Sequence, residues 1–171
     1  SIIDGTITST ITIAVDDANS DDDFDAVTDQ TLSVDTTDDD VAGFTIEETE
    51  GATEVDESGS TDTFTIVLDA QPTNDVVVLA TASNDETEAI VSGSITFTSE
   101  NWDTPQTVTV TGVDDDLVDG DQTYDITISI VDTISDDDFD GVADQSVSST
   151  TLDDDAPGFT IEETDAATEV D

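Results

Sequence analysis

The sequence predicts an all-β protein, a seven-stranded immunoglobulin-like antiparallel sandwich arranged in tandem repeats of 115 residues. Three observations lead to this prediction. Apolar residues alternate with polar ones in short runs, no segment keeps an apolar period of 3.6, and a long stretch of the sequence occurs twice. Seven short strands within about 110 residues are typical of such a sandwich.

Alternation and turn signals define the strands of one repeat. The clearest run is Tyr124–Ile130, where every second residue is apolar and the residues between are Asp, Thr and Ser. Threonine suits the exposed face of a strand, because it favours extended backbone and tolerates water. The predicted strands are Gly43–Thr49, Asp62–Asp69, Asp75–Ala82, Gly93–Thr98, Gln106–Val113, Gln122–Val131 and Gln145–Leu152.

The internal repeat sets the domain organisation. Ser20–Asp56 and Ser135–Asp171 are identical at 26 of 37 positions without a gap, at an offset of 115 residues. We therefore expect residues 1–40 to be the C-terminal third of a preceding repeat, residues 43–155 a complete repeat, and residues 156–171 the first strand of the next. The short connections imply neighbouring repeats or subunits in a head-to-tail array, within a longer secreted chain.

The charge of the chain is its most unusual property. It has 46 acidic residues and no Lys, Arg or His, so no side chain can form a salt bridge with a carboxylate. Two carboxylates about 4 Å apart repel by roughly 4 kcal/mol at an effective dielectric near 20. Bound divalent cations or high salt must offset this repulsion. The alternating apolar runs argue against disorder of the whole chain.

Composition also excludes several functions. Nucleic acid is not an expected partner, because no side chain can pair with phosphate. No apolar run reaches the roughly 18 residues of a membrane span. Without His, Cys, Lys or Arg, only a pair of carboxylates could act in catalysis, so we do not expect an enzyme. The absence of cysteine leaves the compartment open on this criterion.

Acidic residues concentrate in loops that should meet at one end of the sandwich. If successive strands run up and down, the loops after strands one, three, five and seven share an end, here called the acidic pole. Calcium takes six to eight oxygen ligands, so converging carboxylates are what it requires. The predicted calcium ligands at this pole are Glu57, Asp114, Asp115, Asp116, Asp119, Asp153, Asp154 and Asp155, with Asp38, Asp39 and Asp40 in the preceding repeat.

A second candidate lies in a loop at the other end, here called the opposite pole. Residues 136–144 read D-x-D-x-D-G-x-x-D, like the first nine positions of a calcium loop, with Gly141 expected to permit a sharp turn. An EF-hand would have Glu at the twelfth position, where Val147 stands, and would be flanked by helices. The predicted ligands are Asp136, Asp138, Asp140 and Asp144, with Asp21, Asp23 and Asp25 in the earlier copy. For every cluster the alternative is a solvated acidic loop.

At several stretches the sequence resembles the Calx-beta domain, especially its copies in large bacterial surface proteins. The matching segments are Val55–Gly59, Ser94–Thr98, Asn101–Val110, Val113–Asp116 and Asp153–Asp155. The resemblance covers the whole repeat. It implies a seven-stranded sandwich that binds calcium at one pole, with ligands at Glu57, Asp114, Asp115 and Asp153–Asp155. The loop Ser83–Ser92 departs from the family pattern, which makes Asp85 a weak ligand candidate.

These observations predict a calcium-binding structural repeat of an extracellular or cell-surface fibre, adhesin stalk or biofilm matrix filament. Ca²⁺ would neutralise the acidic poles and stiffen the junctions between domains. Two alternatives stay open: an adhesive module that binds glycan or protein, and an acidic surface-layer type repeat adapted to high salt without a specific metal. Trp102 could stack on a ligand, although a place capping the core is the simpler interpretation.

Overall fold

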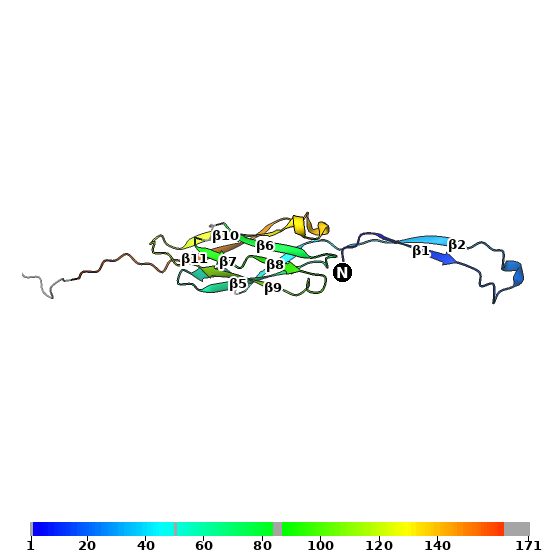
Figure 1. The fold of residues 1–171 in the computed structure, drawn as a ribbon, viewed down its shortest axis with the longest axis horizontal. Coiled ribbons are helices and arrows are strands. Elements are labelled where there is room, and N and C mark those ends of the chain that lie inside the picture. Colours follow the sequence, from blue (N-terminus) through cyan, green and yellow to red (C-terminus); the bar gives the residue numbers. More distant parts are fainter. Residues whose placement is uncertain (1, 50, 84–86, 163–171) are drawn as a thin grey trace, which may run out of the picture.

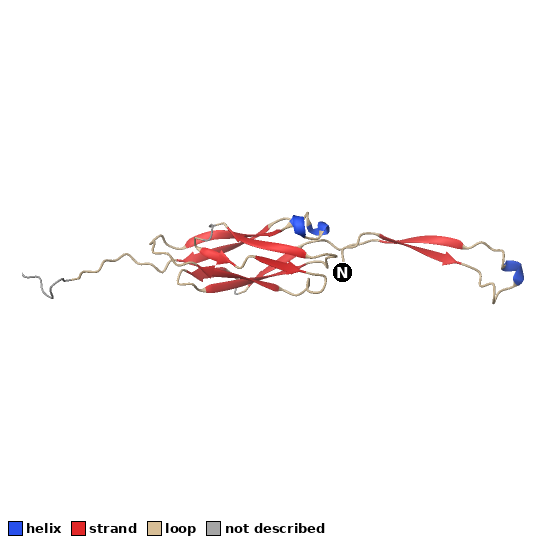
Figure 2. Cartoon of the chain, viewed as in Figure 1, coloured by secondary structure: helices blue, strands red, loops and turns tan. Residues whose placement is uncertain are grey.

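The computed structural model describes residues 2–49, 51–83 and 87–162 and shows an elongated all-β molecule (Figures 1 and 2). A β-sandwich forms the middle. A separate two-stranded hairpin extends beyond one of its ends, and residues 156–162 leave from the other end (Figure 1). In the described part of the chain, no helix is long and apolar enough to cross a membrane.

Two sheets make up the sandwich. All neighbouring strands are antiparallel except β4 and β11, which run parallel. One sheet contains, in spatial order, β4 (Thr53–Asp56), β11 (Gln145–Leu152), β10 (Gln122–Ile130), β6 (Val76–Ala82) and β8 (Ser94–Phe97). The other contains β3 (Phe44–Glu48), β5 (Thr61–Leu68), β9 (Gln106–Gly112) and β7 (Ala89–Val91).

Each predicted strand overlaps a strand of the structure, but the predicted number of seven is wrong. The sandwich has two further short strands, β4 and β7, in segments predicted as loops. In both places one run of chain changes sheet, from β3 to β4 and from β7 to β8. Gly51 (φ 82°) and Gly93 (φ 84°) lie at these transitions, where positive φ favours glycine. Strands of three or four residues are too short to show a clear alternation.

The core lies between the two sheets, as the alternation predicts. Phe64, Val108, Ile126 and Ile128 are fully buried, and the polar residues between them face outward. A 3₁₀ turn, η3 (Asp137–Phe139), adds Phe139 to the same cluster from a loop. Trp102 is partly buried and packs against the core, and its carbonyl oxygen accepts a hydrogen bond from the Leu68 amide.

The separate hairpin pairs β1 (Ile7–Ile13) with β2 (Gln30–Thr36). Its register runs from Ile7 opposite Thr36 to Ile13 opposite Gln30, the register of β10 and β11 displaced by 115 residues. The loop of the hairpin carries the 3₁₀ turn η1 (Asp22–Phe24), the counterpart of η3. The two hairpins therefore share a local structure, while a tandem array of whole repeats stays a prediction.

Truncation of Phe139 tests the role of η3 in the core. Because this side chain is fully buried, Phe139→Ala should lower the free energy of unfolding by about 3–5 kcal/mol. Phe24→Ala is a matched control, since Phe24 occupies the equivalent position but is 57 % exposed. Urea unfolding followed by near-ultraviolet circular dichroism measures both. Equal effects of the two substitutions would contradict the assignment of Phe139 to the core.

Candidate metal centre

The register of the β4–β11 pair builds the acidic pole. Asp56 lies opposite Leu152, and the Glu57 amide donates to the Leu152 carbonyl oxygen at 3.2 Å. Because these two strands are parallel, the residues that follow them leave the sheet at the same end. Glu57 and Asp153 are thus brought together by the sheet itself.

Gly112 brings a third segment to this end. A Cβ atom at this position would lie 2.1 Å from the Asp56 carbonyl oxygen, so no other residue fits there without displacing backbone. The Gly112 amide also donates to the Ser60 carbonyl oxygen at 3.0 Å. This close approach places the segment that begins at Val113 beside the turn that contains Glu57.

Three carboxylates converge at the acidic pole. One oxygen atom from each of Glu57, Asp153 and Asp155 lies within 4.8 Å of the other two. Glu57 is only 1 % exposed. Its Oε2 atom and the Oδ2 atom of Asp155 are buried and accept no hydrogen bond. A buried carboxylate oxygen without a partner is costly, and these two lie in one cluster.

Hydrogen bonds hold Asp153, one of the three acids of the cluster, in place. Its Oδ2 accepts from the Gly120 amide at 2.7 Å and its Oδ1 from the Asp155 amide at 2.8 Å. The Asp153 amide donates to Oδ1 of Asp121 at 3.2 Å. The same carboxylate therefore fixes both the segment before β10 and the segment after β11.

A network of buried hydroxyl groups lies on β10 and β11, next to the strand end that carries Asp153. Ser149 donates to the Tyr124 hydroxyl at 3.0 Å, and Oγ1 of Thr151 lies 3.3 Å from the same oxygen. Thr151 also lies within 3.2 Å of the Glu88 carbonyl oxygen. These contacts tie the segment that carries Glu88 to β10 and β11.

Burial and mutual repulsion perturb the acids of the pole. Burial, together with the negative charges of neighbouring acids, raises the pKa of Glu57 to about 6. These neighbours are Asp115, Asp153, Asp119 and Glu88. Burial also raises the pKa of Asp155, with Asp116 as the strongest charged neighbour. Burial likewise raises the pKa of Glu88. The fold thus gathers negative charge that it does not itself neutralise.

The donor set fits a hard cation. All three converging groups are carboxylates, and calcium binds oxygen at 2.3–2.6 Å, so one ion can contact oxygens up to about 5 Å apart. Zinc sites are built mainly from Cys and His, which the sequence lacks. An ion among Glu57, Asp153 and Asp155 would also give partners to the two unpaired buried oxygens.

The other predicted ligands of this pole surround the cluster without joining it. Asp115 is half-buried, and its Oδ1 accepts from the Leu117 amide at 2.6 Å. The remaining ones are exposed: Asp114, Asp116, Asp119 and Asp154. Asp115 and Asp119 nevertheless lie near enough to raise the pKa of Glu57. Asp85 lies outside the described residues.

The preceding copy repeats part of this arrangement. Oxygens of Asp38, Asp39 and Asp40 lie within 4.8 Å of one another. Asp38 accepts from the amides of Gly5 and Asp40, which matches the bonds of Asp153 displaced by 115 residues. Within residues 1–40, this cluster corresponds to the Asp153–Asp155 side of the acidic pole.

The loop of residues 136–144 is organised differently from a calcium loop. Asp136 is 3 % exposed, and its Oδ2 accepts from the Thr73 amide (2.7 Å), the Thr73 hydroxyl (2.8 Å) and the Asn74 amide (2.6 Å). Its Oδ1 caps η3 by accepting from the Asp138 amide at 3.1 Å. Burial alone would raise the pKa of Asp136, but these hydrogen bonds lower it.

Both oxygens of Asp136 are therefore already satisfied by protein donors. Asp138, Asp140 and Asp144 are exposed around it, and burial and neighbouring acids raise the pKa of Asp140. Gly141 does not adopt the positive φ expected for a sharp turn. In the earlier copy Asp21, Asp23 and Asp25 are all exposed. The residues of this loop form a 3₁₀ turn that Asp136 caps and that places Phe139 in the core.

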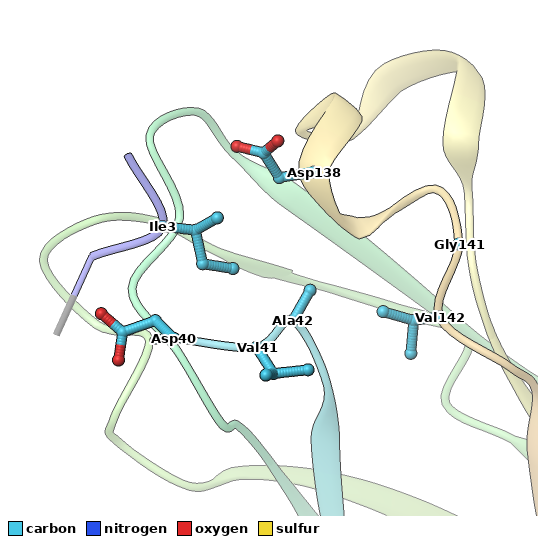
Figure 3. A pocket seen from close by; sticks show the side chains of 7 residues that line it. All are labelled: Ile3, Asp40, Val41, Ala42, Asp138, Gly141 and Val142. Atoms are coloured by element: carbon cyan, nitrogen blue, oxygen red, sulfur yellow. The ribbon is translucent and has the colours of Figure 1, made fainter. Parts of the chain in front are cut away.

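A groove of about 360 Å³ marks the junction between the leading segment and the sandwich (Figure 3). Ile3, Val41, Ala42 and Val142 line it together with Asp40, Asp138 and Gly141. Asp40, from the Asp38–Asp40 cluster, and Asp138, from the loop of residues 136–144, therefore line one groove. The side chain of Ile3 stands between the two carboxylates in Figure 3.

The predicted ligand set leaves out two acids that shape the metal centre. Glu88 perturbs Glu57, and Asp121 orients Asp153. Loop parity places Glu88 at the acidic pole, because it follows the third predicted strand, although it is not among the predicted ligands. Asp121 immediately precedes a predicted strand, and its proximity to Asp153 follows only from the pairing of β10 with β11.

No protein-family model and no curated protein matches the chain. Solved structures with similar backbones include the apo form of the Calx CBD1 domain (16 % identity, 68 % of this chain, 100 % of that chain, TM-score 0.46). They also include the E. coli chaperone DraB (10 % identity, 70 % of this chain, 59 % of that chain, TM-score 0.45). The periplasmic chaperone SfaE is a third (9 % identity, 72 % of this chain, 62 % of that chain, TM-score 0.44).

The chain spans about three fifths of each chaperone. At TM-scores below 0.5 these likenesses carry no inference about the function of this chain. The fold and the site themselves define an all-β sandwich with a buried carboxylate cluster at one pole.

The raised pKa of Glu57 predicts a pH dependence of the metal-free protein. Its pKa rises from about 4.5 to about 6 on folding, so the folded state binds more protons between these values. Stability from this group is present below about pH 4.5 and is lost as pH rises through about 6. Urea unfolding in chelator should show this loss, and Glu57→Gln should reduce it. An unchanged pH profile in Glu57→Gln would contradict the burial of this charge.

Asp136→Ala should destabilise the sandwich without changing metal affinity. Hydrogen bonds to a charged group contribute about 1.5–3 kcal/mol each, and the substitution removes those that the Thr73 and Asn74 amides donate to Asp136. Asp21→Ala, at the equivalent exposed position, should have little effect. Thermal unfolding measures stability, and calcium titration of the folded variants measures affinity. Loss of a calcium-binding event in Asp136→Ala would instead support the predicted calcium loop.

Proposed function

We propose that this chain is a calcium-binding structural repeat of an extracellular fibre, adhesin stalk or matrix filament. The observation that carries the proposal is the convergence of Glu57, Asp153 and Asp155, with two buried oxygens that have no partner. In a chain without a basic side chain, a bound cation is the means of neutralising such a cluster. Glu57, Asp153 and Asp155 hold Ca²⁺, and Asp115 and Asp119 contribute negative charge around it.

The position of the cluster supports a structural role. The acidic pole lies where residues 156–162 leave the sandwich, so an ion there acts at the exit of the chain (Figure 1). Asp38 and Asp40 stand at the corresponding exit of the preceding copy, next to the groove at the opposite pole of the sandwich. Calcium at each exit reduces repulsion between successive units and limits their relative motion.

Calcium should raise the melting temperature where sodium at equal ionic strength does not. Ligand at about 100 times its Kd adds about 2.7 kcal/mol to the free energy of unfolding per site. Calorimetric titration and thermal scans, with and without chelator, measure binding and stabilisation. Glu57→Gln and Asp155→Asn should abolish the calcium-dependent rise. Glu100→Gln removes an exposed acid outside the cluster and should leave it intact.

The same experiment separates the proposal from the high-salt alternative. If sodium and calcium stabilise equally at matched ionic strength, screening alone explains the acidity and the calcium role is wrong. The main candidate of the adhesive alternative is Trp102, and its partial burial against the core favours the calcium proposal over this alternative.

A further inference from the structure

Two separate segments of the chain join the β1–β2 hairpin to the opposite pole of the sandwich. The first is residues 2–5, which precede β1, and the second is residues 38–43, which link β2 to β3. Both lie between the hairpin and the sandwich in Figure 1. A junction made by one segment can swing freely, whereas two attached segments restrain bending and twisting.

The first segment docks on the loop between β5 and β6. Ile2 lies opposite Gln71 in an isolated parallel β-bridge, and the Ile3 amide donates to the Gln71 carbonyl oxygen at 3.4 Å. The Ile3 side chain is partly buried and packs against the core cluster of the sandwich. It lies in the junction groove, between the carboxylates of Asp40 and Asp138 (Figure 3). Backbone pairing and an apolar side chain thus attach this segment.

The loop that receives this segment is itself fixed to the sandwich. Ala70 and Pro72 are buried, so the residues on both sides of Gln71 are anchored. The Gln71 side chain donates to the Ser99 carbonyl oxygen at 2.8 Å, which ties it to the loop after β8. The backbone of Gln71 is therefore held in position to pair with the incoming segment.

The second segment is attached next to the first. The Asp69 amide donates to the Gly43 carbonyl oxygen at 2.9 Å, and Ala42 packs against the core cluster. Asp69 and Gln71 belong to the same connection between β5 and β6. The two segments therefore enter the sandwich side by side.

Asp38 joins the two segments to each other. Its Oδ2 atom accepts from the amides of Asp4 (2.9 Å) and Gly5 (2.8 Å), and its Oδ1 atom accepts from the Asp40 amide at 2.9 Å. Gly5 has a φ of 67°, a conformation that favours glycine and turns the chain from the docked residues into β1. One carboxylate of the second segment thus holds the first segment through backbone amides.

We propose that residues 2–5 are a latch that fixes the β1–β2 hairpin to the sandwich at a set angle, and that Asp38 positions this latch. The opposite pole of the sandwich is then a docking surface for the preceding copy in the same chain. The latch uses apolar groups and backbone hydrogen bonds, because two acidic surfaces without a basic residue cannot form salt bridges. It acts without a metal ion and does not rest on the calcium function proposed above.

Spin labels on the 171-residue chain report the angle between its two parts. The sequence has no cysteine, so Thr10→Cys on β1 and Thr127→Cys on β10, both at exposed positions, give one label on each part. Electron–electron double resonance in chelator measures the distribution of the distance between the labels. The unaltered junction should give one narrow population. Its mean should be the same in about 0.15 M and about 1 M sodium chloride, although the Debye length falls from about 8 Å to about 3 Å.

Two substitutions disable the latch. Ile3→Ser removes its apolar contact, and Asp38→Ala removes the acceptor that holds it. Each should abolish the narrow population in chelator. Val118→Ser is the matched control for the first, because Val118 is the counterpart of Ile3 at the offset of 115 and is 55 % exposed. Asp29→Ala, which removes an exposed acid from the hairpin loop, is the control for the second, and both controls should keep the narrow population.

A broad population in the unaltered chain in chelator would overturn the proposal, and its narrowing in calcium would assign the restraint to the ion. A narrow population that survives both Ile3→Ser and Asp38→Ala would overturn it too, since residues 38–43 would then suffice. Neither substituted residue lies in a strand, so thermal scans should give an unchanged melting temperature for the sandwich. Calcium titration of the same proteins reports the site at Glu57, which distinguishes failure of the latch from failure of the proposed calcium function.

Discussion

The decisive constraint on this protein is negative charge that no side chain can neutralise. Its 46 carboxylates have no basic partner, so the fold manages them with backbone amides, hydroxyl groups, distance and water. Asp136 shows the first solution, because amide and hydroxyl donors satisfy both of its oxygens. Protein donors do not suffice at Glu57 and Asp155, since each keeps a buried oxygen without a donor.

The contrast between Asp136 and Glu57 separates a structural acid from a candidate ligand. Both side chains are almost fully buried. Hydrogen bonds lower the pKa of Asp136 despite its burial, whereas burial and surrounding acids raise that of Glu57. A charge count treats the two sites alike. Only the presence or absence of donors around each carboxylate decides which one needs a cation.

The two hairpins of the chain illustrate how tertiary packing changes the role of one sequence pattern. β1–β2 and β10–β11 share register, loop type and about half of their residues. In the sandwich the apolar face of the hairpin is part of the core, and in the separate hairpin it is open. An element that is complete in its hydrogen bonding can therefore be incomplete in its packing.

The sequence by itself determined the all-β class, because alternation reports directly which residues of a strand face inward. It also determined the repeat and the gathering of acidic loops at one end, since loop parity follows from strand order. Tertiary structure decided the rest. The short strands β4 and β7 exist through pairing with β11 and β9, and their own residues give little local signal. The choice of Glu57, Asp153 and Asp155 among many acids depends on the parallel register of β4 and β11 and on the close approach at Gly112, contacts between segments that lie far apart in the sequence.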